Sequence, residues 1–174
     1  MTGNTAHLAA FVEKMKAQQM NPIVIDTFSD YYRQLVDGET GLVSDRDISP
    51  VAAEELAAVR SLQDRAAQGK AALDRTILIK LNGGLGTSMG LTTAKSLLEV
   101  KPGKSFLSVI LHQAGHTGVE LALMNSFSTH DDTVAAVEAI GAGRPRMFRQ
   151  HMFPKIRRKD LAPAVWPANP DLEW

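Results

Sequence analysis

The sequence predicts an α/β protein with a helical amino-terminal region, and two observations support this class. The first 74 residues place apolar side chains at helical spacing, whereas residues 76–81 and 119–124 are short, branched and almost continuously apolar runs. Segments long enough for one helix each follow these runs. Strand, helix, strand and helix in that order are typical of an α/β fold with a parallel sheet.

The composition excludes several classes of protein before any element is placed. The 174 residues include 19 Lys+Arg and 19 Asp+Glu, so the basic excess of a typical nucleic-acid or anionic-membrane binder is missing. No stretch approaches the roughly 20 apolar residues of a membrane span, and the first ten residues do not resemble a secretory signal. With no cysteine, thiolate metal sites and cysteine nucleophiles are excluded. We therefore expect a cytoplasmic protein that binds neither nucleic acid nor membrane.

Residues 1–74 are expected to form a helical region with three helices. The first has its apolar face over residues 8–15 and stops at Asn21-Pro22. The second runs from Pro22 to Val36 and ends at Gly38. Its expected core stripe is Val24, Phe28, Tyr31, Tyr32 and Leu35. The third begins at Ser49-Pro50, reaches about Ala67 and ends at Gly69.

Residues 75–174 are expected to form the first part of a nucleotide-binding domain. Its first strand, residues 76–81, is expected to be buried on both sheet faces because it is almost entirely apolar. The segment 105–118 is barely long enough for a crossover helix, which predicts a parallel second strand over residues 119–124. A helix is expected over residues 131–140, and mostly loop or short strand from Pro145 onward.

The most informative segment is Lys80-Leu-Asn-Gly-Gly-Leu-Gly-Thr-Ser-Met-Gly90, which is followed by Lys95. Four glycines within eight residues, directly after a strand, let backbone N–H groups approach a ligand that any Cβ would hold away. Such a glycine loop (residues 83–90) suits phosphates or a nucleotide base better than a ligand-free turn, which needs only one or two glycines.

Three nucleotide-binding interpretations compete for this loop. A P-loop would need glycine five positions before Gly103, where Leu98 stands, so that interpretation fails. A dinucleotide fingerprint fits poorly, because Glu99 comes too early for the acidic residue that should follow the glycines. The third interpretation is a nucleotidyltransferase loop, in which a downstream lysine offsets phosphate charge without Walker geometry.

Motifs along nearly the whole chain together resemble the UDP-glucose pyrophosphorylase family. These are residues 80–96, 97–101, 104–107, 123–129, 153–156 and 166–174, with Gln150 and Gly38-Glu-Thr-Gly41. The resemblance implies a Rossmann-like, GT-A-like nucleotidyltransferase domain preceded by a helical region. Because several motifs recur in order, it is far more specific than the glycines alone.

The resemblance also implies a role for individual residues. Those expected to bind UTP are Leu81, Asn82, Gly83, Gly84, Met124 and Gln150. Lys95 is expected at the phosphates, where its ammonium is the catalytic charge. The Gln150 amide is expected to read uracil, because it can donate to a ring carbonyl while it accepts from N3–H.

The implied activity is a uridylyltransferase that makes UDP-glucose and pyrophosphate from UTP and glucose 1-phosphate, with Mg²⁺ as the cofactor. The alternatives that stay open are a non-catalytic nucleotide-binding or interaction module and, more weakly, an NAD(P)-binding domain. No protein metal site is expected: His112 and His116 lack a third ligand, and His130-Asp131-Asp132 is better explained as a helix start.

The chain is expected to be the amino-terminal part of such an enzyme. Relatives continue beyond Trp174 into a Pro-Pro-Gly-His-Gly-Asp segment, and the segments that correspond to 107–123 and 133–150 are usually longer. We expect this chain to bind UTP weakly, to make no UDP-glucose by itself and to self-associate through an unpaired strand edge.

Overall fold

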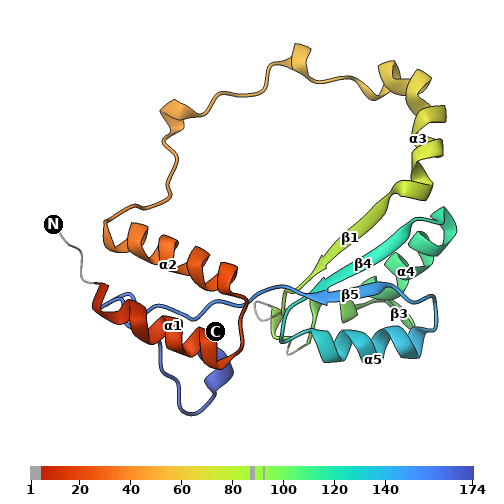
Figure 1. Cartoon of the computed structure of the whole chain (residues 1–174). Helices are drawn as coiled ribbons and strands as arrows, with labels where there is room; N and C mark the ends of the chain where they lie inside the picture. The colour runs from red at the N-terminus through yellow and green to blue at the C-terminus, as the bar shows by residue number, and fades with distance from the viewer. Residues whose placement is uncertain (1–4, 87–88, 92) are drawn as a thin grey trace. The chain divides into compact units, whose positions relative to one another are not determined.

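The computed structural model describes residues 5–86, 89–91 and 93–174 and has an α/β architecture (Figure 1). Its α-helices are α1 (Leu8–Ala17), α2 (Pro22–Val36), α3 (Ala66–Ala72), α4 (Phe106–Thr117) and α5 (His130–Ile140). Its strands are β1 (Ile77–Asn82), β2 (Glu99–Lys101), β3 (Lys104–Ser105), β4 (Glu120–Asn125) and β5 (Arg146–Arg149). Two compact units result, Met1–Pro50 with His151–Trp174, and Val51–Gln150. The boundary predicted after residue 74 stays a prediction.

In the first unit, which we call the helical unit, α1 and α2 pack around an aromatic core. The α2 bounds are those predicted, because the Asn21 side chain accepts a hydrogen bond from the Ile23 N–H at 3.0 Å and Pro22 opens the helix. The ring centroid of Phe11 lies 5.2 Å from that of Phe28 and 5.2 Å from that of Tyr32. Such tilted aromatic pairs add to the free energy gained by burying the rings.

The predicted α2 stripe is right for three of its members and wrong for two. Val24, Phe28 and Tyr32 are buried as predicted. Tyr31 and Leu35 instead face solvent, with 64% and 40% of their surface exposed. Ile25 and Ser29 take their place in the core, so the buried arc lies one position away from the predicted one. Tyrosine tolerates that exposure because its ring ends in a hydroxyl.

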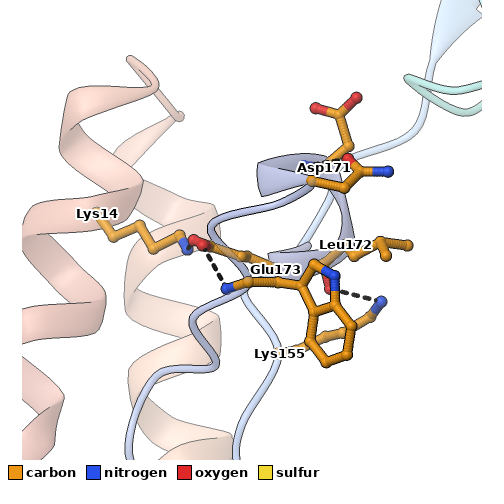
Figure 2. A network of polar contacts seen from close by, with 7 residues as sticks. Lys14, Lys155, Asp171, Leu172 and Glu173 are labelled. Atoms are coloured by element: carbon orange, nitrogen blue, oxygen red, sulfur yellow. Dashed lines mark hydrogen bonds and ion pairs between the residues drawn. The ribbon is translucent and has the colours of Figure 1, made fainter.

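The segment 151–174 closes the helical unit against α1 and α2. Figure 2 shows the Lys14 ammonium of α1 at the Glu173 carboxylate and Lys155 reaching towards the backbone of the same segment. The Lys155 ammonium donates to the Leu172 carbonyl at 2.8 Å, and the Tyr32 hydroxyl donates to the Leu161 carbonyl at 2.9 Å. The Lys14 ammonium lowers the pKa of Glu173, because it stabilises the ionised carboxylate.

The third helix predicted over residues 50–67 is wrong. Residues Ala53–Glu55 and Val59–Arg65 form 3-10 turns, and only α3, which contains Gly69 rather than ending before it, is α-helical. A helix of this length depends on packing its apolar face, but Val59 is 85% exposed and Leu56 is 64% exposed. Because no apolar face of this segment is buried, the helical spacing of its apolar residues is not enough to stabilise an α-helix.

In the second unit, which we call the sheet unit, β1, β4 and β5 form one parallel sheet in that order (Figure 1). This confirms the predicted parallel strands and the crossover helix α4. The Ser105 hydroxyl caps α4 by accepting from the Ser108 N–H at 3.2 Å, and Gly118 ends it at φ +68°. One face of β4 packs on α4 and α5 through Leu121, Leu123, Leu107, Leu111 and Val137.

The prediction that β1 is buried on both faces is wrong. Ile79 is 52% exposed and Leu81 is 66% exposed, and only Asn82 at the end of the strand is buried. Among the described strands, β1 pairs with β4 at one edge and with none at the other, so its side chains have few neighbours. Of the described helices, none is long and apolar enough to span a membrane.

Candidate functional site

Two buried asparagines join the carboxyl ends of β1 and β4. Asn82 and Asn125 are partners in the strand register, and the Asn82 side-chain amide donates to the Asn125 side-chain oxygen at 2.8 Å. The same amide donates to the Thr133 hydroxyl at 2.9 Å, and the Ser96 hydroxyl donates to the Asn82 side-chain oxygen. Because a buried amide without partners is unfavourable, this asparagine network fixes the two strand ends relative to α5.

Thr129 extends the asparagine network to the backbone. Its hydroxyl donates to the Asn82 carbonyl at 2.8 Å and accepts from the Ser126 N–H at 3.0 Å. The His130 ring nitrogen Nδ1 lies 3.2 Å from the Asn125 side-chain nitrogen. The backbone that enters the glycine loop is therefore held by side chains from the β4–α5 turn.

Residues 94 and 95 return to the start of the glycine loop through backbone contacts. The Lys95 N–H donates to the Gly84 carbonyl at 3.1 Å, and Leu85 and Ala94 form an isolated antiparallel bridge. A Cβ added at Gly86 would lie 2.4 Å from the Leu91 side chain, so only glycine fits there. Residues 87, 88 and 92 of the predicted nucleotide segment lie outside the described residues.

Gly83 and Gln150, predicted to share the nucleotide site, lie against each other. An added Cβ at Gly83 would be 2.8 Å from the Gln150 side-chain oxygen, closer than real Cβ contacts. Gln150 reaches this place because it follows β5 directly, and its N–H donates to the Asn125 carbonyl at 2.8 Å. An added Cβ at Gly84 would meet no described atom within 4 Å. The two neighbouring glycines thus have different surroundings.

A cavity of about 360 Å³ lies beside the glycine loop, and Lys95 lines it. We call this cavity the lysine pocket. Its lining residues are Lys80, Leu81, Asn82, Gly84, Met89, Lys95, Ser96, Leu98, Phe106 and Ile110. Its described lining residues include two lysines and several apolar side chains and no carboxylate, an arrangement that favours an anion with an apolar part.

The structure brings the predicted site residues together at the carboxyl end of the sheet, but in two groups. Leu81, Asn82, Gly84 and Lys95 line the lysine pocket. Gly83 contacts Gln150 instead. Met124 is the register partner of Leu81 on β4.

Asn82 is a special case within this site. Both of its amide N–H groups have protein acceptors and its oxygen accepts from Ser96, so in this structure its side chain organises the loop. Asn125, Thr133 and Lys80 were not among the predicted site residues, whereas Asn82 was. A signal for Asn125 was present in the sequence, because an asparagine directly follows each of the two predicted strand runs.

The described residues provide no metal centre. Among them, no group of three or more His, Asp or Glu side chains could hold a metal ion. His112 turns its Nδ1 to the Ser108 carbonyl of its own helix at 2.6 Å, and His130 contacts Asn125. The described side chains therefore form no cluster that would hold the Mg²⁺ expected as the cofactor.

Comparison with known proteins assigns this arrangement to a family. The sequence model of UTP–glucose-1-phosphate uridylyltransferase matches residues 25–174. The enzyme of that name from Solanum tuberosum is 41% identical over 116 residues, covering 62% of this chain and 24% of its own length. The Saccharomyces cerevisiae enzyme is 39% identical over 99 residues, covering 52% of this chain and 20% of its own length.

Solved structures give the same result for the fold. A solved structure of UDP-glucose pyrophosphorylase from Leishmania major superimposes with a TM-score of 0.82 at 36% identity, over 97% of this chain and 37% of that one. UDP-glucose phosphorylase from Trypanosoma brucei gives a TM-score of 0.80 at 33% identity, over 97% of this chain and 36% of that one. The chain spans about a quarter or less of the length of these two curated relatives.

Proposed function

The chain belongs to the UTP–glucose-1-phosphate uridylyltransferase family, and on that premise we propose that it supplies the UTP-binding part of an enzyme that makes UDP-glucose and pyrophosphate from UTP and glucose 1-phosphate. A Leishmania major relative of known structure is described as a complex with UDP-glucose, which supports a uridine nucleotide as the ligand.

The observation that carries this proposal is the different surroundings of the two adjacent glycines. Gly83 faces the Gln150 amide, whereas Gly84 lines the pocket of Lys95. A nucleotide laid across the carboxyl end of β1 would have its base at the first glycine and its phosphates at the second. Ligands of open α/β sheets bind at this end of the strands.

The chemistry follows from this division. The Gln150 amide offers one acceptor and two donors, which suits the carbonyls and N3–H of uracil and mismatches cytosine. In the reaction, a phosphate oxygen of glucose 1-phosphate forms a bond to the α-phosphorus of UTP, and the bond from that phosphorus to pyrophosphate breaks. The Lys95 ammonium stabilises the negative charge on the transferring phosphates without any covalent intermediate.

Magnesium, the remaining partners and the cellular location stay predictions from the family resemblance. The described residues contain no cluster of three or more His, Asp or Glu side chains that would hold Mg²⁺. The unpaired edge of β1 supports the prediction of self-association, and the cytoplasm stays the predicted location. Because the chain spans about a quarter of its relatives, we propose UTP binding for this chain and turnover for the longer family enzyme.

Isothermal titration of the purified chain tests the proposal. UTP is expected to bind, with little or no heat from NADPH. Lys95→Ala is expected to weaken UTP binding by about 10-fold, as for a lost charged hydrogen bond, and to leave uridine binding nearly unchanged. Binding of NADPH with no response to UTP or UDP-glucose would favour the NAD(P)-binding alternative and contradict the proposal.

A further inference from the structure

We infer that Lys80 is a second phosphate-binding cation of the lysine pocket, an inference that rests on the proposed function. Lys80 is the only charged residue in β1, where the other side chains before Asn82 are Ile or Leu. It lies two residues before Asn82, so both side chains point to the same face of the strand.

The strand register places Lys80 on the face that α4 covers. Its partner on β4 is Leu123, a fully buried member of the cluster that includes Leu107 and Leu111 of α4. Phe106 and Ile110 of the same helix line the lysine pocket with it. The pairing of β1 with β4 fixes the backbone position of Lys80, from which its side chain extends.

The asparagine network brings Lys95 to this same face. Asn82 accepts a hydrogen bond from Ser96, the residue after Lys95, and the Lys95 N–H donates to the Gly84 carbonyl at 3.1 Å. The two lysines therefore reach one cavity from opposite sides of Asn82, Lys80 from the strand and Lys95 from the returning loop.

Charge favours an anion between these two lysines. Within the part of the chain that the structure describes, neither Lys80 nor Lys95 forms an ion pair. With no carboxylate in the lining, two ammonium groups at one cavity repel each other and attract a multiply charged anion. A triphosphate has enough charge for both, whereas a nucleoside offers neither lysine a partner.

The competing explanation is that Lys80 only protects an exposed strand edge. Lysines on edge strands oppose pairing with other chains, and β1 has such an edge. This explanation predicts an effect of Lys80 on self-association and none on phosphate affinity. The two roles are therefore separable by experiment.

The test compares Lys80→Gln, Lys80→Arg and Lys101→Gln, with UTP and uridine as ligands in isothermal titration at several salt concentrations. Lys101 lies on exposed β2 outside the lysine pocket, so its variant loses the same charge elsewhere. Lys80→Gln is expected to weaken UTP binding by about 5- to 10-fold, an effect between that of losing an exposed ion pair and that of losing a hydrogen bond to a charged group. The same variant should make UTP affinity depend less on salt concentration. Lys80→Arg should restore most of the affinity, and uridine binding and the Lys101→Gln variant should be unaffected.

The other outcomes distinguish failure of the proposed function from failure of the inference about Lys80. If the unmodified chain does not bind UTP, the proposed function fails and the inference fails with it. If UTP binding is weakened by Lys95→Ala, the variant that tests the proposed function, but not by Lys80→Gln, the inference alone fails. More self-association of Lys80→Gln on sizing, at unchanged UTP affinity, would assign Lys80 to edge protection.

Discussion

β1 and β4 are paired residue for residue and have similar apolar sequences, but their burial is opposite. In β4, Leu121, Ala122 and Leu123 are buried. In β1, the register partners Leu78, Ile79 and Lys80 are exposed. The difference arises from place in the sheet: β4 lies between two strands and under two helices, whereas β1 has one neighbouring strand.

Both strands nevertheless end in a buried asparagine, and these asparagines lie at the proposed site. The residues of β4 before Asn125 are packed in the core, and Asn125 is hydrogen-bonded to Asn82 at the end of the exposed strand. The glycine loop starts directly after Asn82. The comparison therefore separates a strand that packs in the core of the sheet from a strand that leads into the proposed UTP-binding loop.

Truncating one apolar side chain in each strand gives the largest expected effect. Leu123→Ala removes a fully buried side chain and should lower the free energy of unfolding by about 2–5 kcal/mol. Ile79→Ala at the half-exposed position should lower it by about 1 kcal/mol or less. Urea denaturation followed by circular dichroism measures both, and equal losses would contradict the assigned difference between the strands.

Breaking the link between the strand ends is expected to have the next largest effect. Asn125→Ala leaves the buried Asn82 amide with one acceptor fewer, which should destabilise the sheet unit by about 1–3 kcal/mol. The double variant Asn82→Ala/Asn125→Ala should lose less stability than the sum of the two single variants, because both changes remove the hydrogen bond between the two asparagines. Fully additive losses in a double-mutant cycle would show that the two asparagines act independently.

The adjacent glycines give a local test with a built-in control. Gly83→Ala forces the Gln150 side chain away and should reduce the preference for UTP over CTP by about 10-fold, the range of a lost base contact. In a Gln150→Ala background the same change should have little further effect. Gly84→Ala meets no described side chain, so its effect should be independent of Gln150. Titration calorimetry with both nucleotides measures the cycle, and a Gly83 effect that persists without Gln150 contradicts the contact.

The ion pair of Glu173 with Lys14 in the helical unit provides a comparison with the sheet unit. Removing it is expected to have the smallest effect on stability. The pKa of Glu173 is lowered by Lys14, so the ion pair stabilises the folded unit above the unfolded-state pKa and is lost as pH falls through the folded-state pKa. Glu173→Gln should therefore reduce the acid sensitivity of this unit. Asp160, whose pKa is lowered by the Ala162 N–H, should retain part of it. Thermal unfolding at neutral and acid pH measures this, and an unchanged pH dependence would contradict it.

Local signals in the sequence predicted much of this fold. Asn21-Pro22 predicted the start of α2, and the short connection before residue 119 predicted a parallel strand pair. Burial was predicted less well, because it depends on neighbours: β1 is exposed, and the segment 50–67 lacks the packing that would make it helical. The contact of Gly83 with Gln150 joins residues 67 positions apart (150 − 83), and only the family resemblance suggested it.

The central claim is that a uridine nucleotide binds across the carboxyl end of β1, and amide chemical shifts in an NMR titration with UTP test it most directly. We predict that UTP causes saturable chemical-shift changes at the Gly83, Gly84, Lys95 and Gln150 amides. Uridine should change the shifts of the Gly83 and Gln150 amides but not that of Lys95. UTP shifts confined to the helical unit, or shifts at the glycine loop with NADPH and none with UTP, would contradict the claim.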